Sequence, residues 1–310
     1  MQTGDYNVKK KWNATTMITL IIASMLTTMI FGVSPANAAI TAGKFGNALE
    51  FDGANDYVTV PDSPSLRLPS TELTVEAWIY FPSSSPGLQL MIRKWLDADG
   101  GSLSYVLGRS EDNKIYGAVE DQELAHFPSW TTAQTISDLG IEDTWAHIAF
   151  TWKKGTIAAS DGHIFVNGAS VATTFEPVGY SEAFSIGYAA YPLYFARKAD
   201  VVSFSSNYFK GGLDEVRVSN IARTSFSLAT PPSFDGSTVA LWHFDEGSGL
   251  TTNDASANAN HGTISGATWT GTPTVVTTDE LPISFIAIAL VIAIVLVIAV
   301  LLVYFKKRKR

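Results

Sequence analysis

The sequence contains no cysteine, which excludes a disulfide scaffold, thiol catalysis and thiolate metal sites. Charged residues are also scarce: they make up 16% of the chain, against about a quarter of a typical soluble domain. Basic residues are rarest between positions 39 and 280, where 13 Lys and Arg stand against 28 Asp and Glu, a difference of −15. Such a segment repels phosphate backbones, so we expect no nucleic-acid partner. It is compatible with a hard cation such as calcium.

The N-terminal end carries a basic region and an uncharged apolar run. Three lysines at positions 9–11 precede the run 17–33, and a small-x-small site ending at Ala38 follows it. This order predicts a secretory signal peptide over 1–38, with cleavage after Ala38. An uncleaved signal anchor is the alternative, although the run is short for a membrane span.

A second apolar run starts at Leu281, ends at Phe305 and is followed at once by the five basic residues 306–310. At about 1.5 Å rise per residue, a helix of this length spans roughly 37 Å, enough for a hydrocarbon core about 30 Å thick. Basic clusters remain on the cytoplasmic side. We therefore predict a single-pass cell-membrane protein with a transmembrane helix over 281–305. A stalk over 271–280 would carry a domain over 39–270 outside the cell.

The segment between the two ends has the pattern of β-strands. Leu73, Val75 and Ala77 alternate with other residue types, and residues 145–152 alternate in the same way. Asn167-Gly168 stands between two short apolar runs and is typical of a two-residue hairpin turn, because both residues tolerate positive φ angles. Many strands punctuated by Gly and Pro predict an all-β fold, namely a two-sheet antiparallel sandwich or jelly roll.

Five motifs follow one another in this segment: FDGANDYVTVP (51–61), TVEAWI (74–79), TWAHIAFTW (144–152), FVNG (165–168) and GLDEVRV (212–218). In these motifs the sequence resembles the LamG-like jelly-roll domains of the concanavalin A-like lectin/glucanase superfamily, over about residues 44–270. The resemblance implies two curved antiparallel sheets, and often carbohydrate or protein binding aided by calcium. It does not settle the function, because one fold hosts many functions.

Two further motifs, ALWHFDEGSG (240–249) and NHGTISGATW (260–269), resemble the opening strands of that family but stand last here. Either the domain is circularly permuted, or a second domain begins and is cut short. Each motif occurs once, and jelly-roll termini tend to lie close together, which favours permutation. We therefore expect 240–269 to belong to the same fold as 45–60, with Trp242 and Phe244 on one buried face.

Two groups of oxygen-bearing side chains predict calcium (Ca2+) sites. In the first, residues 254–260 place Asp254, Asn258 and other oxygen side chains at every second position. Calcium loops use such spacing because about six to eight oxygens must converge at roughly 2.3–2.6 Å. The EF-hand pattern is absent, since position 259 is alanine and no glutamate closes the loop. A plain polar turn is the alternative.

The second group comprises Asp52, Asp56 and Asp214. Asp214 shares its strand face with Val216 and Val218, which should be buried, so its carboxylate needs hydrogen-bond donors or a cation. Asp52 and Asp56 fall in one turn, and together the three predict a structural calcium site at the rim of the domain. The alternative is that Asp214 accepts backbone N–H groups and that Asp56 holds an Asx-turn.

Catalysis has little support in the sequence. Retaining glucanases of the resembled superfamily use a Glu-x-Asp-x-(x)-Glu strand, and their two carboxylates must lie about 5–5.5 Å apart. The nearest run here, EDQE at 120–123, has a different spacing, and the serine-hydrolase and zinc-protease motifs are absent. His147 alternates within a predicted strand, where we expect a structural role. We therefore predict that the chain is not an enzyme.

Sugar binding relies on aromatic ring faces beside a few fixed polar groups. Two segments without strand pattern, 120–143 and 187–209, are candidate rim loops, and they contribute Trp130, Tyr191 and Tyr194 as candidate ligand contacts. Trp78 and Tyr80 share a strand face that could line a concave sheet. Core packing is the alternative for each of these aromatic residues.

Two functional hypotheses follow from these patterns. The leading one is a cell-surface module, anchored in the membrane, that recognises carbohydrate with or without the assistance of calcium. The alternative is a structural or adhesive cell-envelope protein that binds other proteins and recognises no glycan. Exposed loop aromatics would favour the first, whereas a large flat apolar patch or an unpaired edge strand would favour the second.

Overall fold

The computed structural model describes residues 40–68, 71–85, 87–95, 103–121, 126–155, 158–181, 184, 186–187, 190–197 and 208–271. The predicted signal peptide, the stalk beyond Gly271, the transmembrane helix and the basic tail lie outside this part of the chain, so these four remain predictions. Within the described residues, no helix is both long and apolar enough to cross a membrane.

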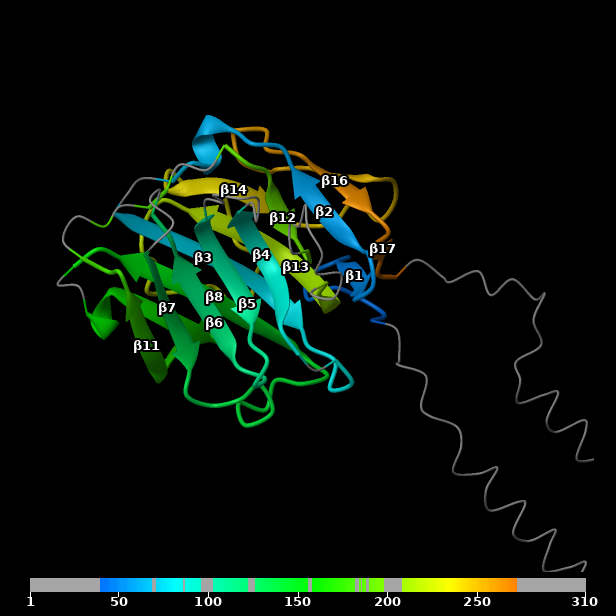
Figure 1. Ribbon diagram of the computed structural model, residues 1–310. Coiled ribbons are helices and arrows are strands. Elements are labelled where there is room, and N and C mark those ends of the chain that lie inside the picture. The colour runs from blue at the N-terminus through cyan, green and yellow to red at the C-terminus, as the bar shows by residue number, and fades with distance from the viewer. Residues whose placement is uncertain are drawn as a thin grey trace, which may run out of the picture. The chain divides into compact units, whose positions relative to one another are not determined.

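The described strands form two antiparallel sheets, named sheet A and sheet B, in a sandwich (Figure 1). Sheet A has the order β10 (Ala169–Val171), β9 (Gly162–Val166), β8 (Trp145–Lys153), β3 (Glu72–Tyr80), β13 (Lys210–Ser219), β1 (Leu49–Asp52) and β17 (Thr268–Trp269), and β14 (Thr238–Trp242) also pairs with β13. Sheet B has the order β11 (Thr173–Val178), β7 (Phe127–Thr132), β6 (Ile115–Val119), β5 (Leu103–Arg109), β4 (Gln89–Trp95), β12 (Leu193–Phe195), β2 (Tyr57–Val60), β16 (Gly262–Ser265) and β15 (Thr251–Thr252). Two short 3-10 helices, η1 (Pro64–Leu66) and η2 (Ala159–Asp161), lie between strands.

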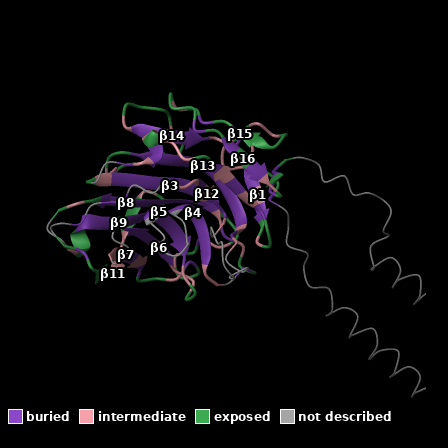
Figure 2. Cartoon of the chain, turned by 45° about the horizontal axis from the view of Figure 1, so that its top comes forward, coloured by how far each residue is buried: buried purple, intermediate pink, exposed green. Residues whose placement is uncertain are grey.

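The hydrophobic core lies between the sheets and follows the period-two pattern of the sequence. On β3, Leu73, Val75 and Ala77 are fully buried in the core, together with residues of β2, β5 and β12 from the other sheet. Figure 2 shows buried residues along most strands and exposed residues mainly in the connections. The prediction of an all-β two-sheet antiparallel sandwich is therefore confirmed.

The last strands of the domain pair with its first strands. β16 lies beside β2, with Ile264 opposite Val58, as the adjacent orange and blue strands in Figure 1 show. β17 pairs with β1 through Trp269 and Leu49. The prediction that 240–269 belongs to the same fold as 45–60 is confirmed by these pairings. Whether this order is a permutation of the family's order remains a prediction.

The predicted hairpin turn lies between β9 and β10. Asn167 has a φ angle of 48° and Gly168 one of 76°, so both residues occupy the left-handed region that a two-residue hairpin turn requires. Val166 and Ala169 face each other across the turn. This local prediction is confirmed.

Two segments cover part of the outer face of sheet A. The N-terminal segment places the Phe45 ring edge-on to the Trp78 ring, with the centroids 5.8 Å apart. The segment after β13 places Phe226 on His147, with the ring centroids 4.9 Å apart. Trp78 and His147 are therefore buried although they point away from the core.

Candidate functional site

The outer face of sheet B carries a cluster of tyrosines at its β2 and β12 strands. Val58, Val60, Leu193 and Phe195 point into the core, so the residues that alternate with them point outward. These outward residues are Tyr57, Thr59 and Tyr194, and each is half-buried. Tyr194 lies opposite Thr59 in the pairing of β12 with β2, which brings the two strands' outward side chains together.

Arg197 and Tyr208 complete this cluster, which we call the tyrosine patch: Tyr57, Tyr194, Arg197 and Tyr208. The Cζ atom of Arg197 lies 4.4 Å from the ring centroid of Tyr57 and 5.4 Å from that of Tyr194. The ring of Tyr208 lies 6.5 Å from the ring of Tyr57. All four side chains are half-buried, so each keeps part of its surface open to solvent.

The chain reaches this position through a fixed turn at Ala196. Ala196 has a φ angle of 64°, which is uncommon for a residue other than glycine. Its N–H donates to the carbonyl of Met91 and its carbonyl accepts from the N–H of Phe209, both at 2.9 Å. These bonds and its full burial hold the turn, which places Arg197 over the tyrosines.

The patch combines three kinds of group that carbohydrate recognition uses. Aromatic rings offer apolar faces, hydroxyl groups donate and accept hydrogen bonds, and a guanidinium donates from a rigid fork. Thr263 on β16 adds an exposed hydroxyl opposite Thr59. A sugar ring could therefore lie on tyrosine while its oxygens meet side-chain donors.

Of the five candidate ligand residues from the sequence, only Tyr194 lies in the patch. Tyr191 is half-buried, and its backbone carbonyl accepts a hydrogen bond of 2.6 Å from Nζ of Lys94. Tyr80 is half-buried on sheet A, where its ring lies 5.8 Å from that of Trp145. Neither contacts the patch residues through a bond or ring contact in the described structure.

The two candidate tryptophans are packing residues, which corrects their assignment to ligand binding. Trp130 is fully buried, its ring stacks on Phe175 at 4.9 Å, and its Nε1 donates to the carbonyl of Ala159. Trp78 is 4% exposed, and Nζ of Lys44 lies 4.3 Å from its ring centroid. The N-terminal segment therefore covers the ring face that a ligand would need.

The sequence missed Tyr57, Arg197 and Tyr208. Tyr57 and Thr59 alternate with two valines, so the period-two pattern could have marked them as outward residues. The place of Arg197 depends on the left-handed turn at Ala196, and alanine gives no sequence signal for positive φ. The position of Arg197 in the patch could therefore not be predicted from the sequence.

The structure does not bring the three predicted calcium ligands of the rim together. Asp56 lies beside Asp52, whose N–H donates to Oδ2 of Asp56 at 2.9 Å. Asp52 faces Lys210 in the pairing of β1 with β13, and Asp214 lies four positions further along β13. At about 3.3 Å per residue, four positions separate Asp214 from Asp52 by roughly 13 Å.

The loop of Asp254 has the hydrogen bonding of a polar turn. The carboxylate of Asp254 accepts from the N–H groups of Leu241, Ser256 and Asn260 at 2.8–2.9 Å. Asn258 is exposed and donates from Nδ2 to the carbonyl of Val239. In the described part of the chain, no three carboxylate or histidine side chains are grouped so that they could hold a metal ion. Calcium binding thus remains a prediction without a ligand set.

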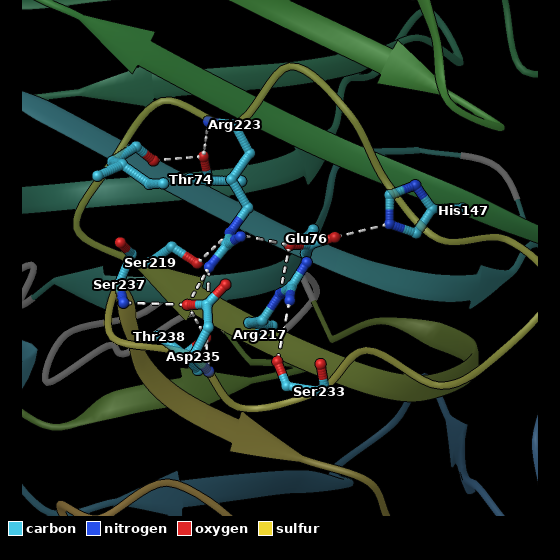
Figure 3. Close-up of polar contacts among 11 residues, drawn as sticks. Thr74, Glu76, His147, Arg217, Ser219, Arg223, Ser233, Asp235, Ser237 and Thr238 are labelled. Carbon is cyan, nitrogen blue, oxygen red and sulfur yellow. Dashed lines mark hydrogen bonds and ion pairs between the residues drawn. The ribbon is translucent and has the colours of Figure 1, made fainter.

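A buried polar network on the outer face of sheet A fastens the segment after β13 (Figure 3). Oε1 of Glu76 accepts from Nε of Arg217 at 2.6 Å, and Oε2 accepts from Nε2 of His147 at 2.9 Å. Burial raises the pKa of Glu76, but the bond from His147 and the charge and bond of Arg217 outweigh it, so the pKa is lowered. Glu76 is 1% exposed, so this network is structural.

Arg223 extends the network along the same segment. Its Nη2 donates to Oδ1 of Asp235 at 2.7 Å, and its Nε donates to Oγ of Ser219 at 2.8 Å (Figure 3). The hydrogen bond from Arg223 lowers the pKa of Asp235 strongly. Through these bonds, Arg223 ties the segment to β13 and to the turn that precedes β14.

Comparisons with known proteins agree with this fold. The sequence profile described as the concanavalin A-like lectin/glucanases superfamily matches residues 52–229, so β14, β15, β16 and β17 lie beyond the match. No curated protein matches the chain in sequence.

Solved structures resemble the chain at low sequence identity. A candidate carbohydrate-binding protein from Bacteroides ovatus is 17% identical with a TM-score of 0.51, over 72% of this chain and 59% of that one, so the chain spans less than two thirds of it. The heptameric SAP-like pentraxin of Limulus polyphemus is 14% identical with a TM-score of 0.41, over 62% and 84%. The CBM40 of a Ruminococcus gnavus sialidase, bound to α2,6-sialyllactose, is 11% identical with a TM-score of 0.40, over 57% and 92%. These likenesses concern the fold alone.

Proposed function

The chain belongs to the concanavalin A-like lectin/glucanases superfamily, whose profile matches more than half of it, and we propose that it binds carbohydrate through the tyrosine patch. One observation carries the proposal. Three half-buried tyrosines and an arginine lie together on an outward sheet face, with the arginine Cζ within 4.4 Å and 5.4 Å of two ring centroids. The Bacteroides ovatus protein of similar fold, itself a candidate carbohydrate binder, supports the same class of ligand.

The partial burial of the patch lowers the entropic cost of binding a ligand. Fully exposed tyrosines would lose more rotamer freedom on binding, whereas these rings are already held by neighbours and by the cation. Thr59 and Thr263 lie on adjacent strands beside Tyr194 and offer hydroxyl groups within the same surface. Sugar rings present such alternating apolar faces and hydroxyl edges, so this surface suits them.

We also propose that the binding domain is displayed outside the cell. The supporting observations are sequence patterns: the basic and apolar run before Ala38, which predicts a signal peptide over 1–38, and the apolar run with a basic tail, which predicts a membrane span over 281–305. Calcium assistance remains a prediction, because the described residues assemble no ligand set for the ion.

The proposed activity is binding rather than hydrolysis. Glu120 and Asp121, the described half of the acidic run that the sequence singled out, are both buried, and Asp121 is paired with Nδ1 of His126. A glycosidase needs two carboxylates that face the sugar from a site open to solvent. Burial of both side chains supports the assignment as a binding module.

The alternative of a protein-binding envelope component receives less support. Sheet B ends at β11, and this edge strand contains Glu176 and Pro177, residue types that limit pairing with another chain. The large apolar side chains exposed in the described residues belong to separate segments: Val178, Ile221, Phe234 and Leu250.

A glycan array with the full-length chain tests the proposal. We expect binding to a subset of glycans, and a loss of affinity of at least about tenfold in Tyr57→Ala and Tyr194→Ala, as for aromatic contacts at the centre of an interface. Phe234→Ala is the control, because Phe234 is an exposed aromatic residue outside the patch. Equal losses in the control, or no glycan bound by the wild type, would contradict the proposal.

A further inference from the structure

Arg197 is held over the tyrosine rings without a carboxylate partner. Among the described residues no acidic side chain forms an ion pair with it, and its buried Nε atom has no hydrogen-bond acceptor. Asp56 precedes Tyr57 in sequence, but its carboxylate accepts the N–H of Asp52 instead. A buried guanidinium N–H without an acceptor is unfavourable, and no group of the described structure satisfies this one. The side chain is only half-buried, so part of it remains open to an incoming acceptor.

A second arginine lies under the same surface. Arg93 on β4 is directly opposite Tyr194 on β12 and is fully buried. Arg93 and Tyr194 therefore share the outward face of sheet B, with Arg93 beneath the surface and Arg197 at it. In a chain with a formal net charge of −8, Arg197 therefore places a cation at the patch surface.

We infer that the ligand of the tyrosine patch is a sugar that carries a carboxylate, and that Arg197 binds this carboxylate. The inference rests on the proposed function and names its ligand class. A guanidinium presents parallel N–H donors that match the two oxygens of a carboxylate. Tyr57 and Tyr194 lie against the guanidinium group, and the sugar ring contacts the tyrosine faces beside it.

The charge distribution favours a single carboxylate over a densely sulfated chain. A polysulfated ligand needs several cations in a row and is repelled by a chain of formal net charge −8. Within the described patch only Arg197 offers a charged group at the surface, since Arg93 is buried. One surface guanidinium matches one carboxylate.

The test compares matched pairs of immobilised glycans with the full-length chain. Each pair consists of an acidic oligosaccharide with a uronic or sialic acid and the same oligosaccharide with that carboxyl group reduced to an alcohol. We expect the acid to bind about tenfold more tightly or better, as for a charged hydrogen-bonded pair. Sulfated oligosaccharides without a carboxylate form the third arm and should bind more weakly than the acids.

Substitutions then assign the preference to Arg197. Arg197→Gln should lower the acid-to-alcohol affinity ratio to about one while binding to the neutral partner persists, and Arg197→Lys should retain part of the preference. Lys153→Gln is the control, because Lys153 is an exposed cation of sheet A. Thermal melts confirm that each variant is folded, and the wild-type comparison stands without any variant.

The outcomes separate the two proposals. Equal binding of acids and alcohols, a stronger preference for sulfate, or a full preference in Arg197→Gln would overturn the carboxylate inference and leave glycan binding intact. If no glycan of any kind binds, the proposed function fails and the inference fails with it.

Discussion

The backbone N–H of Phe45 donates a hydrogen bond of 3.0 Å to Oδ2 of Asp214, 169 residues later in the chain. The N–H of Asn47 likewise donates to Oδ1 of Asp245 at 2.9 Å. Asp214 is fully buried, and its second oxygen, Oδ1, has no hydrogen-bond partner among the described residues. The N-terminal segment is therefore fastened by a carboxyl group in an unfavourable environment.

The neighbours of Asp214 help to raise the pKa of its carboxyl group. Glu215 has a φ angle of 53° in the middle of β13, where the pairing with β3 is irregular, and Oε2 of Glu215 lies 2.5 Å from Nδ1 of His243. Burial, together with the charges of Glu215 and Asp245, raises the pKa of Asp214 to about 8, although the N–H groups of Phe45 and Lys44 lower it. Asp214 is therefore largely protonated in the folded protein near neutral pH.

Stability should fall as the pH rises from 5 to 8. An acid with a raised pKa binds its proton more tightly in the folded state, so folding takes up a proton across this window and is weakened at higher pH. Burial raises the pKa of Glu215, and the bond to Glu215 raises the pKa of His243. Both groups therefore also make the folded state less stable as the pH rises. Urea unfolding at a series of pH values measures the slope of the free energy of unfolding against pH.

Asp214→Asn should flatten this slope, because the amide does not titrate. Asp138→Asn is the control: Asp138 is exposed and its pKa is lowered by hydrogen bonds to Thr135, so it titrates only below the window. The same slope in Asp214→Asn and in the wild type would refute the assignment.

Glu76→Gln should destabilise the domain by about 3–5 kcal/mol, because it leaves Arg217 buried without its carboxylate. Replacing both groups, as in Glu76→Met with Arg217→Met, should recover part of the loss. The matched surface pair is Lys153 with Glu72, in which Lys153 is 66% exposed, and Lys153→Met should change stability by about 0–1 kcal/mol. Urea denaturation at pH 7 compares them, and equal effects of Glu76→Gln and Lys153→Met would refute the prediction.

Much of the fold could be predicted because its signals are local. The alternation on β3 and the Asn-Gly turn are contained within a few residues, and the single occurrence of each motif in 240–269 correctly placed this segment in the same domain. The assignment of the tryptophans to ligand binding was wrong because a period-two pattern does not predict which segments cover the outer face of a sheet. Trp78 points outward as predicted, yet Lys44 and Phe45 cover it, through contacts more than thirty residues apart in sequence.

The positions of the polar site residues also depend on features that a local sequence pattern does not contain. Asp214 was predicted to be buried on the inward face because it shares strand parity with Val216 and Val218, and it is buried. It nevertheless lies on the outer face of sheet A, opposite Trp78, because the irregular pairing after Asp214 changes the parity, and the N-terminal segment covers it there. Its distance from Asp52 depends on the register between β1 and β13, which the sequence does not encode locally. Arg197 could not be found because its position depends on a positive φ angle at an alanine.

The last prediction concerns the strands from β14 onward, which we expect to be indispensable for folding. Trp242 is fully buried, its ring lies 4.9 Å from that of Phe195, and its Nε1 donates to the carbonyl of Asn260 at 2.8 Å. Trp242→Ala should cost about 3–5 kcal/mol, a large share of a typical stability of roughly 5–15 kcal/mol. Leu250→Ala is the control, since Leu250 is 67% exposed and its loss should change stability by no more than about 0.5 kcal/mol.

Truncation tests the same point more severely. A chain of residues 39–231 lacks β14, β15, β16 and β17, which exposes the edge of β2 and half of β13 and removes Trp242 from the core. Unpaired edges and an open core favour aggregation, so this product should be aggregated or unfolded, whereas residues 39–271 should unfold cooperatively. Size-exclusion chromatography and urea denaturation distinguish the two. A soluble 39–231 product with a cooperative transition would mean that the late strands are an appendage of an already complete sandwich, and that their pairing with β1 and β2 contributes little to its stability.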